Sequence, residues 1–350
     1  MLRKSLFRIA IGALLIFVLT GTFGCYKEKS PALQTSTPRD QVTLNLNWLP
    51  EHPEYWIALE KGFWAEQNID VKIIRGYGSG DTVGKIAMKQ AEFGIADMGS
   101  LILARAKDEN VRVKAVANRL TAFPAVIVYN EASGIKEPKD LEGKKIVGSA
   151  NSAYRILFPA FAKANGIDQS KVQWKLVEPS LQQVAFIKGE VDAWTSHIEN
   201  ISTIEKLTGK PVYFFSYRDE GKLDCYGDSL IVHEDTIAQN PDLVRRFVAG
   251  YLKGIRYCIE NPSEAGDIVK RHVPEIDAGL TTKGWQVTLE NNILVSDESR
   301  KNGLGWMSGD RMANTIDSVL RAYDLQKEMS PETVYTSQFL SENPIYPPNK

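Results

Sequence analysis

The chain of 350 residues lacks several features that would point directly to a class of function. It has no excess of either charge, because 42 Lys and Arg stand against 43 Asp and Glu. A surface without a basic excess gives no electrostatic basis for binding nucleic acid. There are only four histidines and three cysteines, and their spacing fits neither HExxH nor another metal motif. The sequence therefore predicts no metal site and no nucleic-acid partner.

Nucleotide and hydrolase motifs are also missing, although the stretch RGYGSGDTVGK (75–85) looks at first like a phosphate loop. A Walker A loop requires a glycine where Ser79 stands, and Ser or Thr where Ile86 stands. A G-x-S-x-G elbow around Ser79 would require glycines at the positions of Tyr77 and Asp81. These departures predict no catalytic residue, no cofactor and no enzyme activity.

The N-terminus has the layout of a secretory signal peptide, with Arg and Lys before the apolar run 9–19. That run is much shorter than the roughly 20 residues of a membrane-spanning helix. Phe23-Gly24-Cys25 resembles the end of a lipoprotein signal, although Thr22 stands where leucine is usual. We expect a signal peptide over 1–25, lipidation of Cys25, and a flexible tether over 26–40. Ordinary cleavage or an uncleaved anchor remains the alternative; either way the protein is expected outside the cytoplasm.

What the chain does contain is an alternation of apolar strand patterns and helical patterns, with 43% apolar residues. This rhythm predicts an α/β protein with parallel sheets flanked by helices, in two domains. The expected strands are 42–46, 71–74, 93–96, 111–117, 125–129, 145–148, 172–177, 191–194, 212–215 and 228–232. Helices are expected from Tyr55 up to Asn68, and near 82–90, 99–107, 152–165 and 181–188. From Asn240 onwards the pattern is mainly helical, with helices at 241–259, 262–271, 283–295 and 311–322.

Four stretches carry a family resemblance: LNWLPEHPEYWIALEKGFWAEQNIDVKII, AEFGIADMGSLILARA, SGIKEPKDLEGKKIVGS and KGEVDAW. Together they resemble the solute-binding proteins of the nitrate/sulfonate/taurine and thiamine-pyrimidine group of ABC importers. The resemblance implies a periplasmic-binding-protein type II fold, in which two α/β lobes are joined by two crossing strands and close on a ligand by a hinge motion. It implies one lobe from 41–126 and 227–350, and a second lobe from 127–226.

The resemblance also implies partners: a small-molecule solute, and a membrane permease driven by a cytoplasmic ATPase. A monomer is expected. The group includes pyrimidine synthases, which are enzymes on this fold, but their cysteine-rich signature has no counterpart among Cys25, Cys225 and Cys258. An oxidising compartment permits a disulfide between Cys225 and Cys258, and two free, buried thiols are the alternative.

Ligand contacts in such folds lie at the carboxyl ends of strands. Asn47 and Trp48 follow the first expected strand, and Tyr55 follows on the next helix, so we expect all three at the ligand. Trp48 could instead be a core residue. Asp97 ends the third strand and is a candidate ligand acceptor, or alternatively the N-cap of the next helix.

Further candidates come from the loops and from the second lobe. Tyr77, Ser79 and Gly80 lie in the glycine-rich turn, which could instead be a plain turn stabilised by Asp81. Phe123 precedes the first crossing. In the second lobe the candidates are Ser152, Tyr154 and Trp194.

The number of aromatic candidates favours a planar ring as ligand, such as a thiamine-pyrimidine precursor. Asp81 and Asp97 disfavour an anion, whereas Arg119 and Arg155 keep an alkylsulfonate or taurine-like ligand open as the alternative. A secreted pyrimidine-synthase-like enzyme is the alternative from another functional class.

Overall fold

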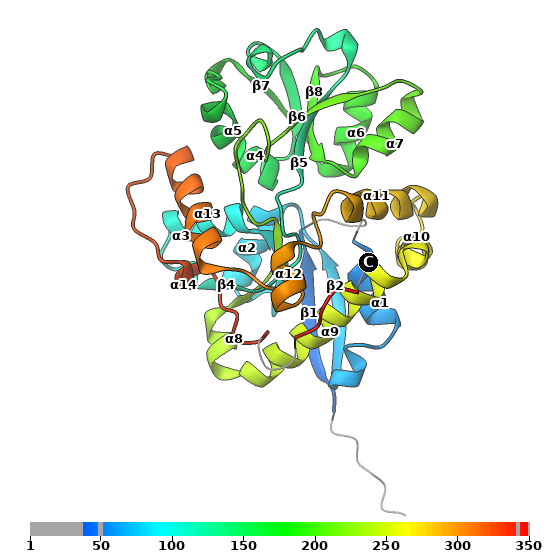
Figure 1. The fold of residues 1–350 in the computed structure, drawn as a ribbon, viewed down its shortest axis with the longest axis vertical. Helices are drawn as coiled ribbons and strands as arrows, with labels where there is room; N and C mark the ends of the chain where they lie inside the picture. Colours follow the sequence, from blue (N-terminus) through cyan, green and yellow to red (C-terminus); the bar gives the residue numbers. More distant parts are fainter. Residues whose placement is uncertain (1–37, 48–51, 341–343, 349–350) are drawn as a thin grey trace, which may run out of the picture. The chain divides into compact units, whose positions relative to one another are not determined.

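The computed structural model describes residues 38–47, 52–340 and 344–348, so Cys25 and Trp48 lie outside the described residues. The described chain contains two five-stranded sheets (Figure 1). In the first sheet the strand order is β2-β1-β3-β10-β4, and in the second it is β7-β6-β8-β5-β9. The first sheet consists of β1 (Asp40–Leu46), β2 (Ile69–Arg75), β3 (Phe93–Asp97), β4 (Val113–Asn118) and β10 (Asp228–His233). The second consists of β5 (Ala125–Tyr129), β6 (Lys145–Gly148), β7 (Gln173–Leu176), β8 (Ala193–His197) and β9 (Tyr213–Ser216).

Each sheet is mostly parallel and contains one antiparallel strand. β1 pairs in parallel with β2 and β3, while β10 runs antiparallel to β3 and β4. β6 pairs in parallel with β7 and β8, while β5 runs antiparallel to β8 and β9. Strands β3, β5 and β10 are buried along their whole length, as expected for strands covered on both faces. The expected α/β architecture of two lobes is confirmed.

Two segments connect the sheets. The chain leaves the first sheet after β4 and returns to it before β10, through 119–124 and 217–227. These segments lie side by side, since the Gly227 N–H donates to the Leu120 carbonyl over 2.9 Å. A Cβ at Gly227 would meet the Ala122 carbonyl oxygen at 2.8 Å, so glycine permits this close approach. We call the sheet of β1 with its packed helices the first lobe, and the sheet of β5 with its helices the second lobe.

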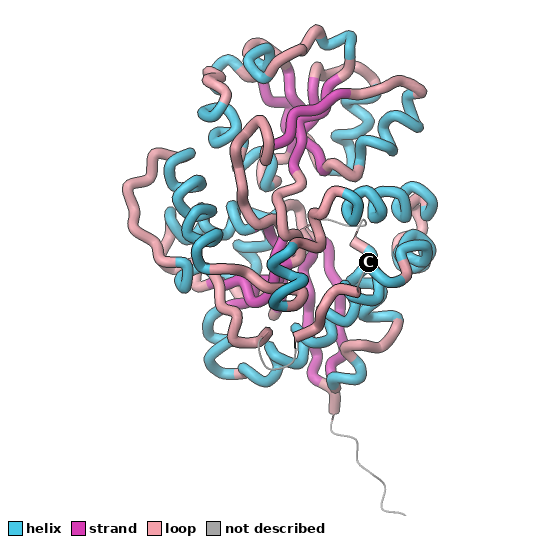
Figure 2. The backbone as a smooth tube through the Cα atoms, viewed as in Figure 1, coloured by secondary structure: helices cyan, strands magenta, loops and turns pink. Residues whose placement is uncertain are grey.

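Helices cover both sheets (Figure 2). Between strands of the first lobe lie α1 (Pro53–Glu60), α2 (Ser79–Ala87) and α3 (Met98–Lys107). The second lobe holds α4 (Ala153–Ile156), α5 (Phe158–Ala164), α6 (Pro179–Ile187) and α7 (Asn200–Thr208). After β10 the chain forms α8 (Glu234–Gln239), α9 (Pro241–Glu260), α10 (Ala265–His272), α11 (Ala278–Glu290), α12 (Asp297–Asn302), α13 (Gly309–Ala322) and α14 (Pro331–Val334).

One expected helix is split. The pattern over 152–165 predicts a single helix, but the structure has α4 and α5 with a junction at Leu157. Pro159 lies in the first turn of α5, where its missing N–H costs nothing, and it could not continue α4 without losing a hydrogen bond.

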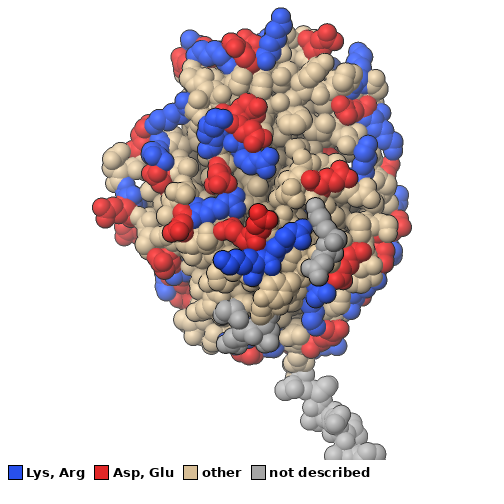
Figure 3. Space-filling model, in the orientation of Figure 1, with Lys and Arg blue, Asp and Glu red and all other residues tan. Residues whose placement is uncertain are grey.

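The C-terminal helices contact both lobes. α11 packs against α7, and α13 packs against both α3 and α5. Within the described part of the chain, no helix is long and apolar enough to cross a membrane. Cys225 and Cys258 are free and buried, so they form no disulfide with each other. Acidic and basic side chains are interspersed on the face seen in Figure 3, in line with the balanced composition.

Candidate ligand-binding site

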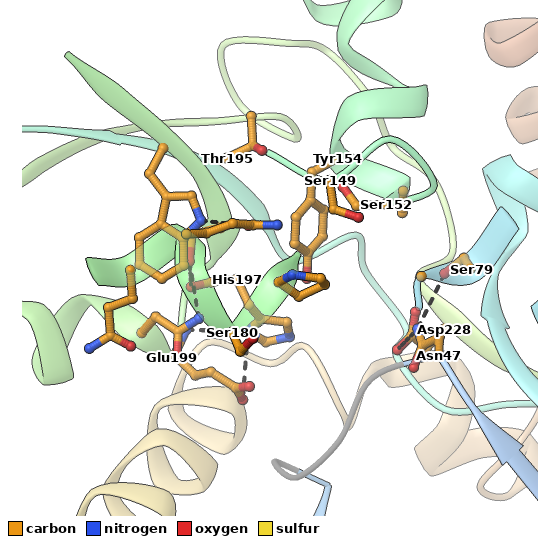
Figure 4. A pocket seen from close by; sticks show the side chains of 18 of the residues that line it. Asn47, Ser79, Ser149, Ser152, Tyr154, Ser180, Thr195, His197, Glu199 and Asp228 are labelled. Atoms are coloured by element: carbon orange, nitrogen blue, oxygen red, sulfur yellow. Dashed lines mark hydrogen bonds and ion pairs between the residues drawn. The ribbon is translucent and has the colours of Figure 1, made fainter. Parts of the chain in front are cut away.

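A cavity of about 170 Å³ is lined by residues of both lobes (Figure 4). The first lobe supplies Asn47, His52, Gly78, Ser79 and Asp228, which we call the first-lobe wall. The second lobe supplies the second-lobe wall, made of Ser149, Ser152, Ala153, Tyr154, Pro179, Ser180, Gln182, Gln183, Trp194, Thr195, Ser196, His197, Glu199 and Asn200. Figure 4 shows Asn47, Ser79 and Asp228 together on one side and His197, Ser180 and Glu199 on the other.

The first-lobe wall is organised around the side-chain amide of Asn47. This residue follows β1 directly, at the carboxyl end of a parallel strand. Its Nδ2 donates to Ser79 Oγ over 3.2 Å and to Asp228 Oδ2 over 3.1 Å. Ser79 begins α2 and also accepts a hydrogen bond from the Asp97 N–H over 3.1 Å. Four segments distant in sequence are thereby joined at one point of the wall.

Arg119 lies directly behind this wall and is fully enclosed, at 2% exposure. Its Nε donates to the buried carboxylate of Glu54, and its Nη2 donates to His52 Nδ1 over 2.8 Å. Its Nη1 lies 3.7 Å from Asp228 Oδ2. Burial raises the pKa of the Asp228 carboxyl, while Arg119 and Asn47 oppose that rise. Burial and the Arg119 charge together hold the pKa of His52 well below its usual range, so His52 is neutral.

The second-lobe wall is built from strand ends and helix starts. Trp194, in β8, donates from Nε1 to Gln182 Oε1 of α6 over 2.9 Å. Ser152 caps α4 by accepting from the Arg155 N–H over 3.2 Å. His197 ends β8, and its Nδ1 accepts from the Glu199 N–H over 3.2 Å. Burial, followed by the charge of Arg119, lowers the pKa of His197 to about 3, so this ring is also neutral.

Glu199 connects the pocket to the other lobe. It lines the cavity and its Oε2 accepts from Thr288 Oγ1 of α11 over 3.1 Å. The backbone of α11 approaches closely there, since a Cβ at Gly284 would meet Glu199 Cβ at 3.4 Å. This side of the pocket is therefore held by a contact between lobes.

The glycine-rich turn 75–85 makes a second contact between lobes. Gly78 has φ +110°, and a Cβ there would collide with the Asn151 carbonyl oxygen. The Gly80 N–H donates to that same oxygen over 3.1 Å. Asp81 accepts from the Tyr77 N–H over 3.0 Å and stabilises the turn. The glycines thus permit a close approach to the second lobe.

Of the residues expected at the ligand, five line the cavity: Asn47, Ser79, Ser152, Tyr154 and Trp194. Trp48 lies outside the described residues. The other five occupy different places.

Tyr55 and Tyr77 lie in opposite environments, both away from the cavity. Tyr55 is fully buried and stacks on Tyr251 of α9 at 5.7 Å, because α1 packs that face against α9. His52, at the N-cap of α1, lines the cavity instead. Tyr77 is 46% exposed, and its ring lies near Arg75 and Lys85.

Gly80, Asp97 and Phe123 are contact or core residues rather than lining residues. Gly80 bonds across to Asn151, as described above. Asp97 is completely buried and accepts from the Ser100 N–H over 3.0 Å, so it caps α3. Phe123 is buried behind the pocket residue Tyr154, with ring centroids 5.9 Å apart.

Several lining residues were not expected from the sequence: Asp228, His52, Gln182 and Glu199 among them. Asp228 could have been found from the topology. It begins β10, which runs antiparallel to β3 and pairs it with Asp97, so the start of β10 lies at the sheet edge where parallel strands end.

The lining combines aromatic rings with acidic groups. It offers the rings of Tyr154, Trp194 and two neutral histidines, and the carboxylates of Asp228 and Glu199. Among the described residues, no Lys or Arg lines the cavity, and no group of three or more His, Cys, Asp and Glu side chains could hold a metal ion.

Proteins of known role are similar to this chain over nearly its whole length. The riboflavin-binding protein RibY of Chloroflexus aurantiacus is 25% identical, over 95% of this chain and 97% of its own. The 4-amino-5-hydroxymethyl-2-methylpyrimidine phosphate synthase of Legionella pneumophila is 24% identical, over 88% of this chain and 95% of its own. A formylaminopyrimidine-binding protein of Halalkalibacterium halodurans is 24% identical, over 87% of this chain and 93% of its own.

The fold matches solved binding proteins. The alkanesulfonate-binding protein SsuA of Xanthomonas axonopodis, bound to MOPS, superposes with a TM-score of 0.66 at 13% identity, over 86% of this chain and 99% of its own. At that identity the likeness concerns the fold alone. The family described as "NMT1/THI5 like" matches residues 49–265, more than half of the chain. The resemblance inferred from the motifs is confirmed, and the chain belongs to the NMT1/THI5-like family.

Proposed function

We propose that the protein is the solute-binding receptor of an ABC importer, which traps one small molecule between its lobes. The observation that supports this most directly is the cavity itself, with walls from two lobes that are joined by two adjacent crossing segments. Such an arrangement permits hinge closure around a ligand. The closed form would then dock on a membrane permease, outside the cytoplasm.

The ligand that this cavity suits is a planar heterocycle with one ring, neutral or weakly basic. A cavity of about 150 Å³ holds benzene, and the cavity here is about 170 Å³. The proteins named as binding riboflavin and formylaminopyrimidine both take heterocycles, and the size of the cavity favours the smaller type. A thiamine-pyrimidine precursor is the chemical class we propose.

An alkylsulfonate is the less favoured ligand. The sulfonate group needs cations or several N–H donors. Arg119 is already engaged by Glu54, and neither Arg119 nor Arg155 is among the lining residues. Two carboxylates in the lining further oppose an anion.

A pyrimidine-synthase-like enzyme is the second candidate, because a relative carries that name. The cysteines of the described chain do not favour it. Cys225 and Cys258 are buried, and burial raises the pKa of the Cys225 thiol to about 12, so neither is a reactive thiolate.

We further propose that residues 1–25 are a lipoprotein signal, that Cys25 carries the lipid, and that the mature protein is a monomer tethered by residues 26–40. Mass spectrometry of the membrane-bound protein from its native host tests this: a diacylglyceryl mass on an N-terminal Cys25 peptide supports it, and a free N-terminus elsewhere contradicts it.

Native mass spectrometry of freshly purified protein tests the function. A co-purified heterocycle at one per chain, released on denaturation and chemically unchanged, supports the receptor. A retained sulfonate would contradict the proposed heterocycle and support the alternative ligand. Chemical conversion of the released compound on incubation with the protein would favour the enzyme.

A further inference from the structure

Asn47 Oδ1 and His197 Nε2 lie in the pocket walls and have hydrogen-bonding capacity but no partner among the described residues. Both side chains line the cavity and are more than nine-tenths buried, at 8% and 6% exposure. An unpaired buried polar atom costs about 1–3 kcal/mol, so each such atom in a binding site is a candidate for contact with a ligand.

The orientation of the Asn47 amide is settled by its neighbours. Its nitrogen donates to Ser79 Oγ and to Asp228 Oδ2, and a carboxylate can only accept from an amide. The unpaired Oδ1 is therefore an acceptor.

Asp228 adds a second acceptor beside it. Its side-chain contacts with Asn47 and Arg119 are both made by Oδ2, which leaves Oδ1 as the oxygen available to a ligand. The buried pair of Arg119 with Glu54 holds this carboxylate in place from behind. The first-lobe wall thus presents two neighbouring acceptors.

The second-lobe wall presents a donor. His197 Nδ1 accepts from the Glu199 N–H, so the proton of the neutral ring lies on Nε2. Glu199 Oε2 lies 3.6 Å from the same Nδ1, beyond hydrogen-bond distance, and is held by Thr288. The unpaired Nε2 is therefore an N–H donor.

We propose that the pocket selects its ligand by the positions of the ligand's hydrogen-bond donors and acceptors. N–H groups of an amino-substituted ring face Asn47 Oδ1 and Asp228. A ring nitrogen or carbonyl oxygen of the ligand accepts from His197 Nε2. This inference rests on the proposed function and adds which atoms of the two walls recognise the amino group and the ring nitrogen. A ring with an oxo or methyl group in place of the amino group leaves the two acceptors of the first lobe without a donor.

A matched pair of probes tests the proposal without any variant. 4-Amino-2-methylpyrimidine and 2,4-dimethylpyrimidine have the same shape and differ by an amino group in place of a methyl group. We expect calorimetric titration of ligand-free protein to give at least tenfold tighter binding of the amino probe, about the value of one hydrogen bond to a charged group. Equal affinities for the two probes would contradict the proposed recognition of the amino group. They would not contradict the proposal that the protein is a receptor for a heterocycle. Binding of methanesulfonate and of neither pyrimidine would overturn both proposals.

Variants then test which side chains of the pocket contact each part of the ligand. Asp228→Asn should weaken the amino probe about tenfold or more and change the dimethyl probe little, so that the preference for the amino group falls. His197→Phe should weaken both probes to a similar extent, since both keep the ring nitrogens. Asp70→Asn, at an exposed position of β2 in the same lobe, is the control and should change neither affinity. An unchanged amino preference in folded Asp228→Asn protein would remove Asp228 from the contact.

Discussion

The first-lobe wall rests on a buried ion network, whereas the second-lobe wall is assembled mostly from uncharged groups at strand and helix ends. Behind the first wall, Arg119 and Glu54 are both at most 2% exposed and hold Asp228 and His52 by direct contacts. The second wall has the Trp194–Gln182 pair, several hydroxyl groups and a neutral His197. The charge of Glu199 is directed across to Thr288 of the other lobe.

This difference separates two tasks. A buried ion network has little freedom to rearrange, so the first wall is fixed when the first lobe folds and is suited to selecting the ligand. The second wall reaches the first partly through contacts that a hinge motion would break, such as those of Glu199 with Thr288 and of Gly80 with Asn151. It is suited to completing the site on closure, when His197 Nε2 adds a donor to the acceptors of the first wall.

The largest expected effect comes from removing the centre of the ion network. Arg119→Met leaves Glu54 and Asp228 buried without their cation, and we expect a loss of about 3–5 kcal/mol in the free energy of unfolding. Urea denaturation followed by tryptophan fluorescence measures it.

The matched control is Arg112→Met, in which the arginine is half exposed and pairs only at the surface. This control should cost about 1 kcal/mol or less. Equal losses for the two variants would mean that the first wall does not depend on its buried charge.

The second prediction contrasts two buried carboxylates of neighbouring strands, Asp97 and Asp228. Burial raises the pKa of Asp97 to about 6. The folded state then binds the proton more tightly than the unfolded chain, where the pKa is about 3.9. This contribution to stability is fully present below about pH 4 and is lost as the pH rises through 6, by up to ~3 kcal/mol.

Asp97→Asn removes that dependence but retains an oxygen to cap α3. Other carboxylates whose pKa values are lowered, such as Glu142 with a pKa of about 2, act in the opposite sense, so the difference between parent and variant is the quantity to measure. In thermal unfolding between pH 4 and 7, the stability of the variant relative to that of the parent should increase as the pH rises. Ligand affinity should stay unchanged, in contrast to Asp228→Asn; parallel pH curves or a lost affinity would contradict this assignment.

Asp97 also illustrates what sequence reasoning could reach. The position of the residue at the end of β3 was correct, and both of its possible roles were recognisable, but the direction of its side chain depends on packing against α3. Local patterns predicted β6 at its observed bounds and placed β1 and α13 within two residues of theirs. These elements depend on apolar spacing that a short window contains.

The parts that escaped prediction depend on contacts between distant segments. Tyr55 was expected at the ligand, but α9, far along the chain, covers that face of α1. Gln182 lies inside α6 and carries no local signal of a site; its role comes from Trp194. Asp228 begins an antiparallel strand, whereas the pattern used for prediction covers only residues that follow parallel strands.

A smaller effect is expected where the second wall meets α11. Thr288→Val keeps the shape of the buried side chain and removes its hydroxyl, which lies 3.1 Å from Glu199 Oε2 and 3.2 Å from the Gly284 carbonyl oxygen. If this contact belongs to the closed form, the affinity for the amino probe should fall about three- to tenfold. Small-angle scattering of ligand-saturated protein should show a larger radius of gyration than the parent.

Thr282→Val is the control, because the Thr282 hydroxyl accepts from the Gly266 N–H over 3.0 Å within the first lobe. It should reduce stability without changing affinity. An equal loss of affinity in both variants would mean that the Thr288 contact supports α11 and not closure.

The smallest effect is expected at Tyr77, which tests where the first wall ends. The ring is 46% exposed and lies outside the lining residues, while its neighbour Ser79 is 2% exposed and lines the cavity. The backbone N–H of Tyr77, which a substitution retains, makes the contact with Asp81 that stabilises the turn. Tyr77→Ala should therefore change the affinity for the amino probe less than about twofold, as is usual for surface substitutions. Calorimetric titration of both Tyr77→Ala and Ser79→Ala measures the difference, because Ser79→Ala removes a hydrogen-bond partner of Asn47. A tenfold loss in Tyr77→Ala would extend the first wall outward to this ring, and ligand selection would then depend on an exposed aromatic side chain as well as on the buried network.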